Sequence, residues 1–430
     1  MLMRKLTRAA LVTTGVLAIL ASAANAQDKV KLTFLFDNTP STVTFAEALA
    51  AAFEAKNPNV DIETEARPGG ADGDNITKTR LATGEMADVF LYNAGSLFQA
   101  INPVQNLVDV TDEAFQANVV DSFKSTVTGT DGRIYGVPIG TAMGGGILYN
   151  KKIYADLGLS VPKSWAEFMA NNEKIKAAGK VPVIQTFGET WTSQLFVLGD
   201  FYNVQAAVPT FAADYTAGKA KYASTPAAMK GFERQEEVFK AGYLNEDFAA
   251  ATFSDGVTKL ATGEGAHYPM LSFAVTNVKE LAPENVNDVG FFAIPGDDAA
   301  SNGLTTWMPA GLYIPKTSQH QDEAKQFLAF VASVEGCDVQ TAAVGAAGPY
   351  LVKGCKLPDD VPPVVADLQT YFEDGGNSAP ALEYLSPIKG PALEQITVEV
   401  GSGIRSAADG AALYDEDVKK QAQQLGLPGW

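Results

Sequence analysis

The sequence has 430 residues, of which 46% are hydrophobic and 19% charged, and its formal net charge is −18. Nucleic-acid binding depends on basic surface patches, and so does attachment to an anionic membrane, so this acidic balance argues against both. A chain of this length is too long for one hydrophobic core, which predicts two lobes.

The start of the chain is typical of a secretory signal peptide. Residues 1–8 carry three positive charges and no acid, residues 9–20 form a short apolar run, and residues 24–26 read Ala-Asn-Ala. We expect cleavage after Ala26, which would remove the three positive charges. The remainder contains no long apolar stretch and no cysteine near its new amino terminus, so we expect a soluble periplasmic protein without a lipid anchor.

Strand-like and helix-like segments then alternate, the pattern of an α/β fold. Residues 30–36 and 60–64 predict strands. The helix expected between them begins near Thr44 and Glu47, which have the spacing of a capping box. Residues 88–92 predict a buried strand.

A short repeat supports two lobes of similar plan. Residues 80–85 read RLATGE and residues 259–264 read KLATGE, one copy in each half of the chain. Each copy predicts a helix that ends at a left-handed glycine, Gly84 or Gly263, followed by an extended segment.

The second half of the chain continues the alternation. Ser164 and Glu167 have capping-box spacing and predict a helix start that places Trp165 in a core. Residues 181–187 predict a strand, and a helix-rich region is expected from about residue 364 to residue 425.

The two cysteines, Cys337 and Cys355, are separated by 17 residues. In an oxidising compartment the simplest interpretation is one disulfide, which would contribute about 3 kcal/mol to stability by the loop-entropy relation. Free thiols remain the alternative. Metal binding by two cysteines without a nearby histidine is less favoured.

Signatures of catalysis are mostly absent. The two histidines, His267 and His320, lie far apart in the sequence and leave little for a metal site or a Ser-His-Asp triad, and His267 is interpreted as a structural residue. The Gly-Gly-Gly run at 144–146 lacks the Walker lysine, so it predicts a bend or a close approach rather than a phosphate loop. We therefore expect no enzymatic activity, no cofactor and no metal.

Aromatic and amide residues gather where predicted strands end, the place where open α/β sheets usually hold ligands. They are Tyr92, Asn93, Trp191, Phe273 and Trp307. The apolar face of a sugar ring packs on aromatic rings, and its hydroxyls pair with acids and amides, so these residues suit a carbohydrate. Core packing is the alternative for each aromatic ring.

Three segments resemble one known family. Residues 131–138 (DGRIYGVP), 148–152 (LYNKK) and 158–168 (GLSVPKSWAEF) are similar to the central signature of the family 1 extracellular solute-binding proteins. These are sugar-capturing subunits of ABC importers, similar in plan to maltose-binding protein. The resemblance covers residues 28–425.

The resemblance implies an α/β fold of the type II periplasmic binding class, with several crossing segments between two lobes and a ligand cleft between them. The expected N-terminal lobe comprises residues 27–138 and 295–331, and the C-terminal lobe residues 147–286 and 337–430. Crossings are expected near residues 138–147, 286–295 and 331–337.

Matched to the cleft positions of the family, one set of residues is expected to contact the ligand. The set is Asp37, Asn38, Arg67, Tyr92, Asn93, Ser96, Glu189, Trp191, Ser272, Phe273, Trp307, Gly348 and Tyr384. The sequence departs from maltose-binding protein at Met143, where that protein has a sugar-binding carboxylate, and at residues 270–273, where a tryptophan is common. These departures argue against maltose itself.

The function implied is a monomeric periplasmic protein that captures a mono- or oligosaccharide and delivers it to an ABC permease. One alternative keeps the fold but binds an anionic sugar or a phosphorylated polyol, with Arg67 and Lys389 as cationic donors. An alternative of another class is a secreted glycoside hydrolase, which would need two carboxylates across the cleft.

Overall fold

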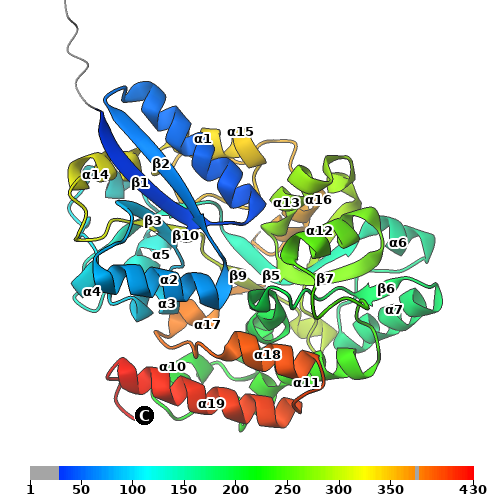
Figure 1. The fold of residues 1–430 in the computed structure, drawn as a ribbon. Coiled ribbons are helices and arrows are strands. Elements are labelled where there is room, and N and C mark those ends of the chain that lie inside the picture. The colour runs from blue at the N-terminus through cyan, green and yellow to red at the C-terminus, as the bar shows by residue number, and fades with distance from the viewer. Residues whose placement is uncertain (1–28, 373–376) are drawn as a thin grey trace, which may run out of the picture.

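Two β-sheets that lie side by side organise the protein (Figure 1). The computed structural model describes residues 29–372 and 377–430, so the expected signal peptide lies outside the described residues. Within these ranges no single helix has the length and apolar composition to cross a membrane. One bent pair of helices, Gln321–Val331 with Val334–Val344, meets those criteria only when the two are taken together.

The first sheet combines the earliest strands of the chain with one that returns much later. β1 pairs in parallel with β2 and β3, whereas β10 is antiparallel to β3 and β4. In spatial order the strands are β2 (Val60–Arg67), β1 (Val30–Asp37), β3 (Val89–Tyr92), β10 (Ala310–Tyr313) and β4 (Gly136–Ile139).

The second sheet is centred on β5, which pairs antiparallel with β7, β8 and β9. Its strands in spatial order are β11 (Ser378–Pro380), β9 (Leu304–Trp307), β5 (Met143–Asn150), β7 (Gly265–Leu271) and β6 (Val181–Val183), with β8 (Val289–Ala293) on β5. The two sheets with their helices form two lobes, as expected for this fold class.

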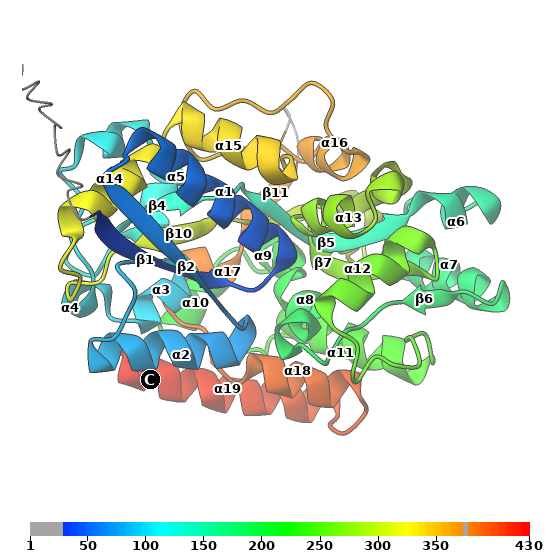
Figure 2. The same ribbon diagram turned by 45° about the horizontal axis from the view of Figure 1, so that its top comes forward.

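Helices cover both sheets (Figures 1 and 2). Those on the first lobe are α1 (Pro40–Lys56), α2 (Gly70–Thr83), α3 (Ser96–Ala100), α4 (Pro103–Asn106), α5 (Asp121–Lys124), α14 (Gln321–Val331) and α15 (Val334–Val344). Those on the second lobe are α6 (Lys151–Asp156), α7 (Trp165–Ala177), α8 (Leu195–Leu198), α9 (Phe201–Ala207), α10 (Phe211–Thr216), α11 (Pro226–Lys240), α12 (Phe253–Thr262), α13 (Ala274–Leu281), α16 (Pro363–Gln369), α17 (Leu382–Leu385), α18 (Leu393–Gly401) and α19 (Ala407–Gln424).

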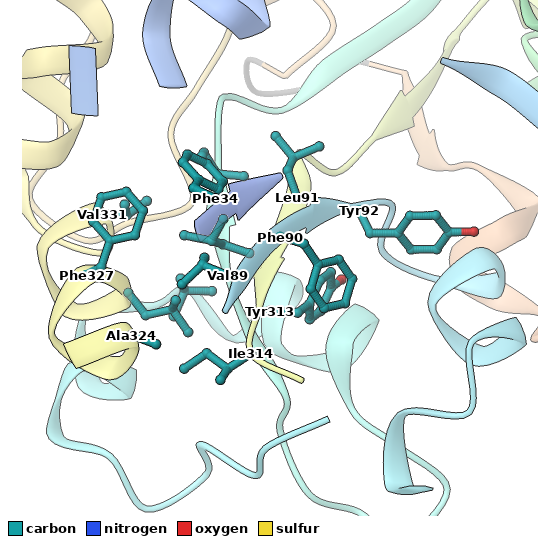
Figure 3. Packing of buried hydrophobic residues seen from close by; sticks show 14 of the residues in the cluster. Phe34, Val89, Phe90, Leu91, Tyr92, Tyr313, Ile314, Ala324, Phe327 and Val331 are labelled. Carbon is teal, nitrogen blue, oxygen red and sulfur yellow. The ribbon is translucent and has the colours of Figure 1, made fainter. Parts of the chain in front are cut away.

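Each lobe has its own hydrophobic core. In the first lobe, Phe34 of β1 packs edge-on against Phe327 of α14 with ring centroids 5.4 Å apart, and Val89 and Ile314 surround them (Figure 3). The second lobe divides its core among several clusters, one of which joins α11, α18 and α19. Independent cores allow the lobes to move as units.

The chain changes sheets at points that differ partly from expectation. It passes from β4 to β5 through residues 140–142, inside the expected crossing at 138–147. The segment 286–295 is not a crossing, because it contains β8, which pairs with β5. The chain returns to the first sheet only at residues 308–309, after β9, so residues 295–307 belong with the second lobe rather than the first.

The third crossing also lies later than expected. α15 packs against α1, so residues 331–337 remain on the first lobe. Val352 still bridges to Val119 of that lobe, and α16 is the first element to pack on β8. The chain therefore crosses between residues 353 and 362.

The helix ends predicted from local sequence signals are confirmed for α2, α12 and α7, and one predicted helix start, in α1, is wrong. Gly84 and Gly263 end α2 and α12 with φ of 78° and 73°, as the repeat predicts. Ser164 caps α7 by accepting a hydrogen bond from the Glu167 amide at 3.3 Å. The capping box expected at Thr44 is wrong, because α1 begins at Pro40 and the Thr44 hydroxyl instead donates to Glu280.

The structure also decides the expectations for the two cysteines, for His267 and for the glycine run. Cys337 and Cys355 form the disulfide. His267 is fully buried between the Tyr154 hydroxyl, 2.7 Å away, and Asn172 Oδ1, 2.9 Å away, which confirms its structural role. The glycines at 144–146 lie inside β5, where a Cβ on Gly145 would approach the Trp307 ring to 2.2 Å, so they serve close approach and make no bend.

Candidate functional site

A cavity of about 290 Å³ lies between the lobes and takes its lining from both. This volume is close to the lower end of the range of small-molecule sites. Its charged side chains are Asp37, Arg67, Asp74, Glu383, Lys389 and Glu394.

The first-lobe wall comes from the carboxyl ends of three neighbouring strands. Asp37 ends β1 and lies opposite Arg67, the last residue of β2, in the parallel register. Asn93 follows β3 with its side chain exposed, and Asp74 comes from the first turns of α2. Parallel strands end at the same edge of a sheet, which is why residues distant in sequence meet here.

Arg67 is a nearly buried cation, with 6% of its surface exposed. Its guanidinium donates to the carbonyls of Pro68 at 2.9 Å and Leu91 at 3.3 Å and lies 5.8 Å from the centre of the Tyr92 ring. In the described part of the chain it has no carboxylate partner within 4.0 Å. Its two terminal nitrogens are hydrogen-bonded to backbone carbonyls, its Nε has no partner in the described part of the chain, and its charge is not neutralised by an ion pair.

The second-lobe wall is aromatic. Trp191 lies in a short 3-10 helix (Thr190–Gln194), half buried, with its ring 6.4 Å from that of Phe273 at an interplanar angle of 25°. Phe253 supports both rings, at 5.3 Å from Trp191 and 5.6 Å from Phe273. Trp191 and Phe273 line the cavity, so they present apolar surface to whatever occupies it.

The helix α17 and the segment after it contribute two further charged lining residues, Glu383 and Lys389. The Trp307 indole donates to Glu383, whose carboxylate is also 3.8 Å from the Lys389 ammonium. Burial, together with the neighbouring Glu383 carboxylate, raises the pKa of Tyr384 well above its ordinary value. The Tyr384 phenol therefore stays neutral and donates to the Met308 carbonyl at 3.3 Å.

Seven of the thirteen residues expected at the site line this cavity, and six do not. The seven are Asp37, Arg67, Asn93, Trp191, Phe273, Trp307 and Tyr384. The six outside the lining are Asn38, Tyr92, Ser96, Glu189, Ser272 and Gly348.

Most of the six have other roles. Tyr92 and Ser96 are buried in the first lobe, and burial raises the pKa of the Tyr92 phenol well above its ordinary value. The Ser272 hydroxyl accepts a hydrogen bond from the Gly144 amide at 3.0 Å, and the Glu189 carboxylate accepts one from the Phe253 amide. Gly348 lies where a Cβ would be 2.1 Å from the Ala142 carbonyl. Ser272, Glu189 and Gly348 therefore contact neighbouring backbone, and ligand contact by any of the six stays a prediction.

Several polar lining residues were not expected from the sequence, among them Asp74, Gln194, Glu383 and Glu394. Asp74 could have been inferred from its place in the first turns of a helix that follows a strand end. Glu383 adjoins the expected Tyr384. Glu394 has no local signal, because only the packing of α18 against the Thr190–Gln194 helix brings it to the cavity.

A shared, partly polar and partly aromatic cavity between two lobes is the arrangement expected of a solute-binding protein. Residues 37–336 match the family model described as bacterial extracellular solute-binding protein, and the chain belongs to that family. It is 25% identical to the "Multiple sugar-binding protein" of Streptococcus mutans, over 80% of this chain and 81% of that one.

Solved structures share the fold. A "Chitin oligosaccharide binding protein" superposes with a TM-score of 0.79 and 21% identity, over 92% of this chain and 100% of that chain. The solute-binding protein RafE in complex with raffinose gives a TM-score of 0.74, also at 21% identity, over the same shares of the two chains.

Proposed function

We propose that this chain is a periplasmic carbohydrate-binding protein that captures a mono- or oligosaccharide between its lobes and delivers it to the permease of an ABC importer. One observation carries the proposal: a single cavity joins Trp191 and Phe273 of the second lobe to Asp37, Asp74 and Asn93 of the first. A sugar ring fits both walls, because its C–H face packs on aromatic rings and its hydroxyls pair with carboxylates and amides.

The names of related proteins support this assignment. The Streptococcus mutans relative is a multiple sugar-binding protein, and similar folds are described with a chitin oligosaccharide, with raffinose and with stachyose. Membership of an extracellular family and a leader with signal-peptide features favour the periplasm. We infer a monomer whose partners are its sugar and its permease.

Capture would proceed by closure of the lobes. The moving bodies that we propose are residues 29–139 with 310–352, and residues 143–307 with 363–430. A ligand that contacts both bodies binds the closed state better than the open state, and this difference in affinity drives closure.

An anionic sugar is the second candidate, because Arg67 has no carboxylate partner in the described part of the chain. The whole lining weighs against it. It holds four carboxylates and two cationic side chains: Asp37, Asp74, Glu383 and Glu394 against Arg67 and Lys389. A neutral sugar therefore fits the site better than an anion.

Hydrolysis is less favoured than binding. Glu383 is engaged by Trp307 and Lys389, and Glu394 by Thr190. The two remaining carboxylates, Asp37 and Asp74, both belong to the first-lobe wall, whereas a glycosidase places its pair on either side of the scissile bond. Incubation with chromogenic glycosides should release no product.

A thermal-shift screen would identify the ligand. The panel should contain raffinose, stachyose, chitin oligosaccharides, common mono- and disaccharides, and sugar acids. A sugar that binds only the native state raises its stability by about 2.7 kcal/mol at a hundredfold excess over Kd. The expected result is a shift with neutral sugars; a shift with sugar acids alone would favour the second candidate.

Trp191→Ala is the sharpest test of the site. Loss of the indole removes apolar contact with the sugar worth about 1–3 kcal/mol, so the Kd should rise at least tenfold with unchanged folding. Isothermal titration calorimetry measures this directly. Trp430→Ala is the matched control, since that indole lies outside the cavity and donates to the Thr216 carbonyl. Wild-type affinity in Trp191→Ala would overturn the assignment of this residue.

A further inference from the structure

Two helices of the first lobe begin at the cavity without caps from their own side chains. The N-cap of α1 is Thr39, whose side chain accepts no hydrogen bond from the helix, and the N-cap of α2 is Gly69, which has no side chain to offer. The first backbone N–H groups of a helix have no intrahelical acceptor and need one from elsewhere. Thr39 and Gly69 line the cavity, so both helix starts face the second lobe.

The second lobe supplies the missing acceptors. The Ser41 amide of α1 donates to Asn277 Oδ1 of α13 at 3.1 Å. The Ala71 amide of α2 donates to Glu394 Oε2 of α18 at 3.3 Å. The same carboxylate oxygen accepts from the Thr190 hydroxyl at 2.8 Å, which fixes its position.

The Ser41–Asn277 contact is buried, whereas the Ala71–Glu394 contact lies at the solvent-exposed edge of the interface. Asn277 is fully buried, and its Nδ2 has no hydrogen-bond partner in the described part of the chain. At the other contact, a Cβ on Gly70 would be 3.1 Å from Glu394 Oε2 and 3.2 Å from Trp191 Cβ. Glycine at this helix start lets the two lobes meet.

We propose that Asn277 and Glu394 are closure residues, which cap α1 and α2 across the cleft in the closed state and release both helix starts when the lobes open. The inference rests on the proposed function, in which closure accompanies sugar binding. The polarity is favourable, because a carboxylate or amide oxygen is stabilised by the positive end of a helix dipole. When the lobes open, the four groups return to water.

The cross-cleft caps affect sugar binding through the populations of the open and closed states. Apparent affinity scales with the fraction of protein that reaches the binding-competent state. Removing the Asn277 cap lowers the share of closed protein and so weakens sugar binding, without loss of a side chain that lines the cavity. Asn277 does not line the cavity, which makes it a positioning residue and the cleaner of the two to test.

The test combines calorimetry with hydrogen exchange, using the sugar that gives the largest thermal shift. Asn277→Ala should weaken binding about three- to tenfold. It should also abolish the sugar-induced protection of residues 40–44 while leaving that of residues 70–74. Glu394→Ala should show the reverse pattern of protection, and it serves as the second variant if Asn277→Ala folds poorly.

Glu280→Ala is the matched control, because Glu280 lies on the same helix as Asn277 and also reaches α1, but its solvent-exposed hydrogen bond to the Thr44 hydroxyl caps no helix start. It should change affinity less than twofold. Unchanged affinity and unchanged protection in both cap variants would overturn the proposal.

An experiment without sugar distinguishes failure of the proposed function from failure of the cross-cleft caps. If no sugar binds, ligand-free wild type and the Asn277→Ala/Glu394→Ala double variant can still be compared by exchange. Lower protection of residues 40–44 and 70–74 in the double variant would support the cross-cleft caps, and equal protection would overturn them.

Discussion

At the level of single residues, the sequence indicates the position of Trp191 at a strand end. It does not indicate which residues the ring contacts. Its place beyond a strand end suggested a surface ring. Its contacts, with Phe253 and Phe273 of its own lobe and with Gly69 and Gly70 of the other, depend on how the lobes meet. The local sequence therefore predicts that the Trp191 ring faces a ligand. It does not predict the other residues that form the same wall of the cavity.

The neighbours Tyr92 and Asn93 show the same limit in another form. Both stand at the end of β3 and both were expected to contact ligand. Successive residues of a strand point to opposite faces, so one of the pair enters the core and the other faces the cavity. The structure places Tyr92 inside and Asn93 in the lining. Composition alone could not decide between them.

His267 makes stability depend on pH in a predictable direction. Burial lowers its pKa from the ordinary 6.5 to about 3, so the folded protein keeps it neutral while the unfolded chain binds a proton below pH 6.5. Stability from this group is complete above pH 6.5 and falls by about 1.36 kcal/mol per pH unit as the pH drops toward 3. Between pH 7.5 and 4.5 the loss is about 2.7 kcal/mol.

Urea unfolding of wild type and His267→Gln at those two pH values measures this contribution. Carboxylates titrate in both proteins and change the stability of both. The contribution of His267 is therefore the difference between wild type and variant in the change of stability with pH. The variant should lose about 2.7 kcal/mol less than wild type over the interval. Equal losses would show that His267 is not held neutral by burial.

At the level of elements, strands and helices were easier to predict than their partners. The strands at 30–36 and 60–64 and the two glycine-terminated helices follow from alternation and from cap chemistry. The placement of β8 and β9 in the second sheet does not follow from the sequence, because the sequence of an apolar strand does not indicate which sheet the strand joins. The misplaced second crossing comes from this missing information, whereas the third was misplaced because α15 packs on α1 of the first lobe.

The segment between Cys337 and Cys355 is an element with two roles. It contributes Gln340, Val344, Gly345, Ala347 and Tyr350 to the cavity. It is also tied to the crossing at 140–142, since Gln340 Oε1 accepts from the Gly140 amide and the Ala142 amide donates to the Pro349 carbonyl, both at 2.8 Å. The disulfide thus anchors a cavity wall beside the hinge.

Replacing both cysteines by serine should cost about 3 kcal/mol of stability, the loop-closure entropy returned to the unfolded chain. It should also weaken sugar binding, because the wall that the loop carries becomes less ordered. Urea unfolding and calorimetry on the Cys337→Ser/Cys355→Ser variant test the two effects separately. An unchanged urea midpoint would contradict the first, and wild-type affinity the second.

At the level of the whole molecule, the family resemblance in residues 131–168 was the feature that predicted the two-lobe fold, and the fold comparisons confirm it. Net charge and length had already favoured a two-lobed protein that binds neither nucleic acid nor membrane. The resemblance placed Asp37 and Trp191 at the cleft, whereas Glu394 could not be predicted, since it reaches the cavity only through the packing of α18.

The central claim is that one sugar engages both lobes and closes them. Small-angle X-ray scattering, with and without a saturating concentration of the sugar found by thermal shift, tests it most directly. The account predicts a smaller radius of gyration in the presence of sugar. A sugar that binds by calorimetry yet leaves the radius of gyration unchanged would contradict it.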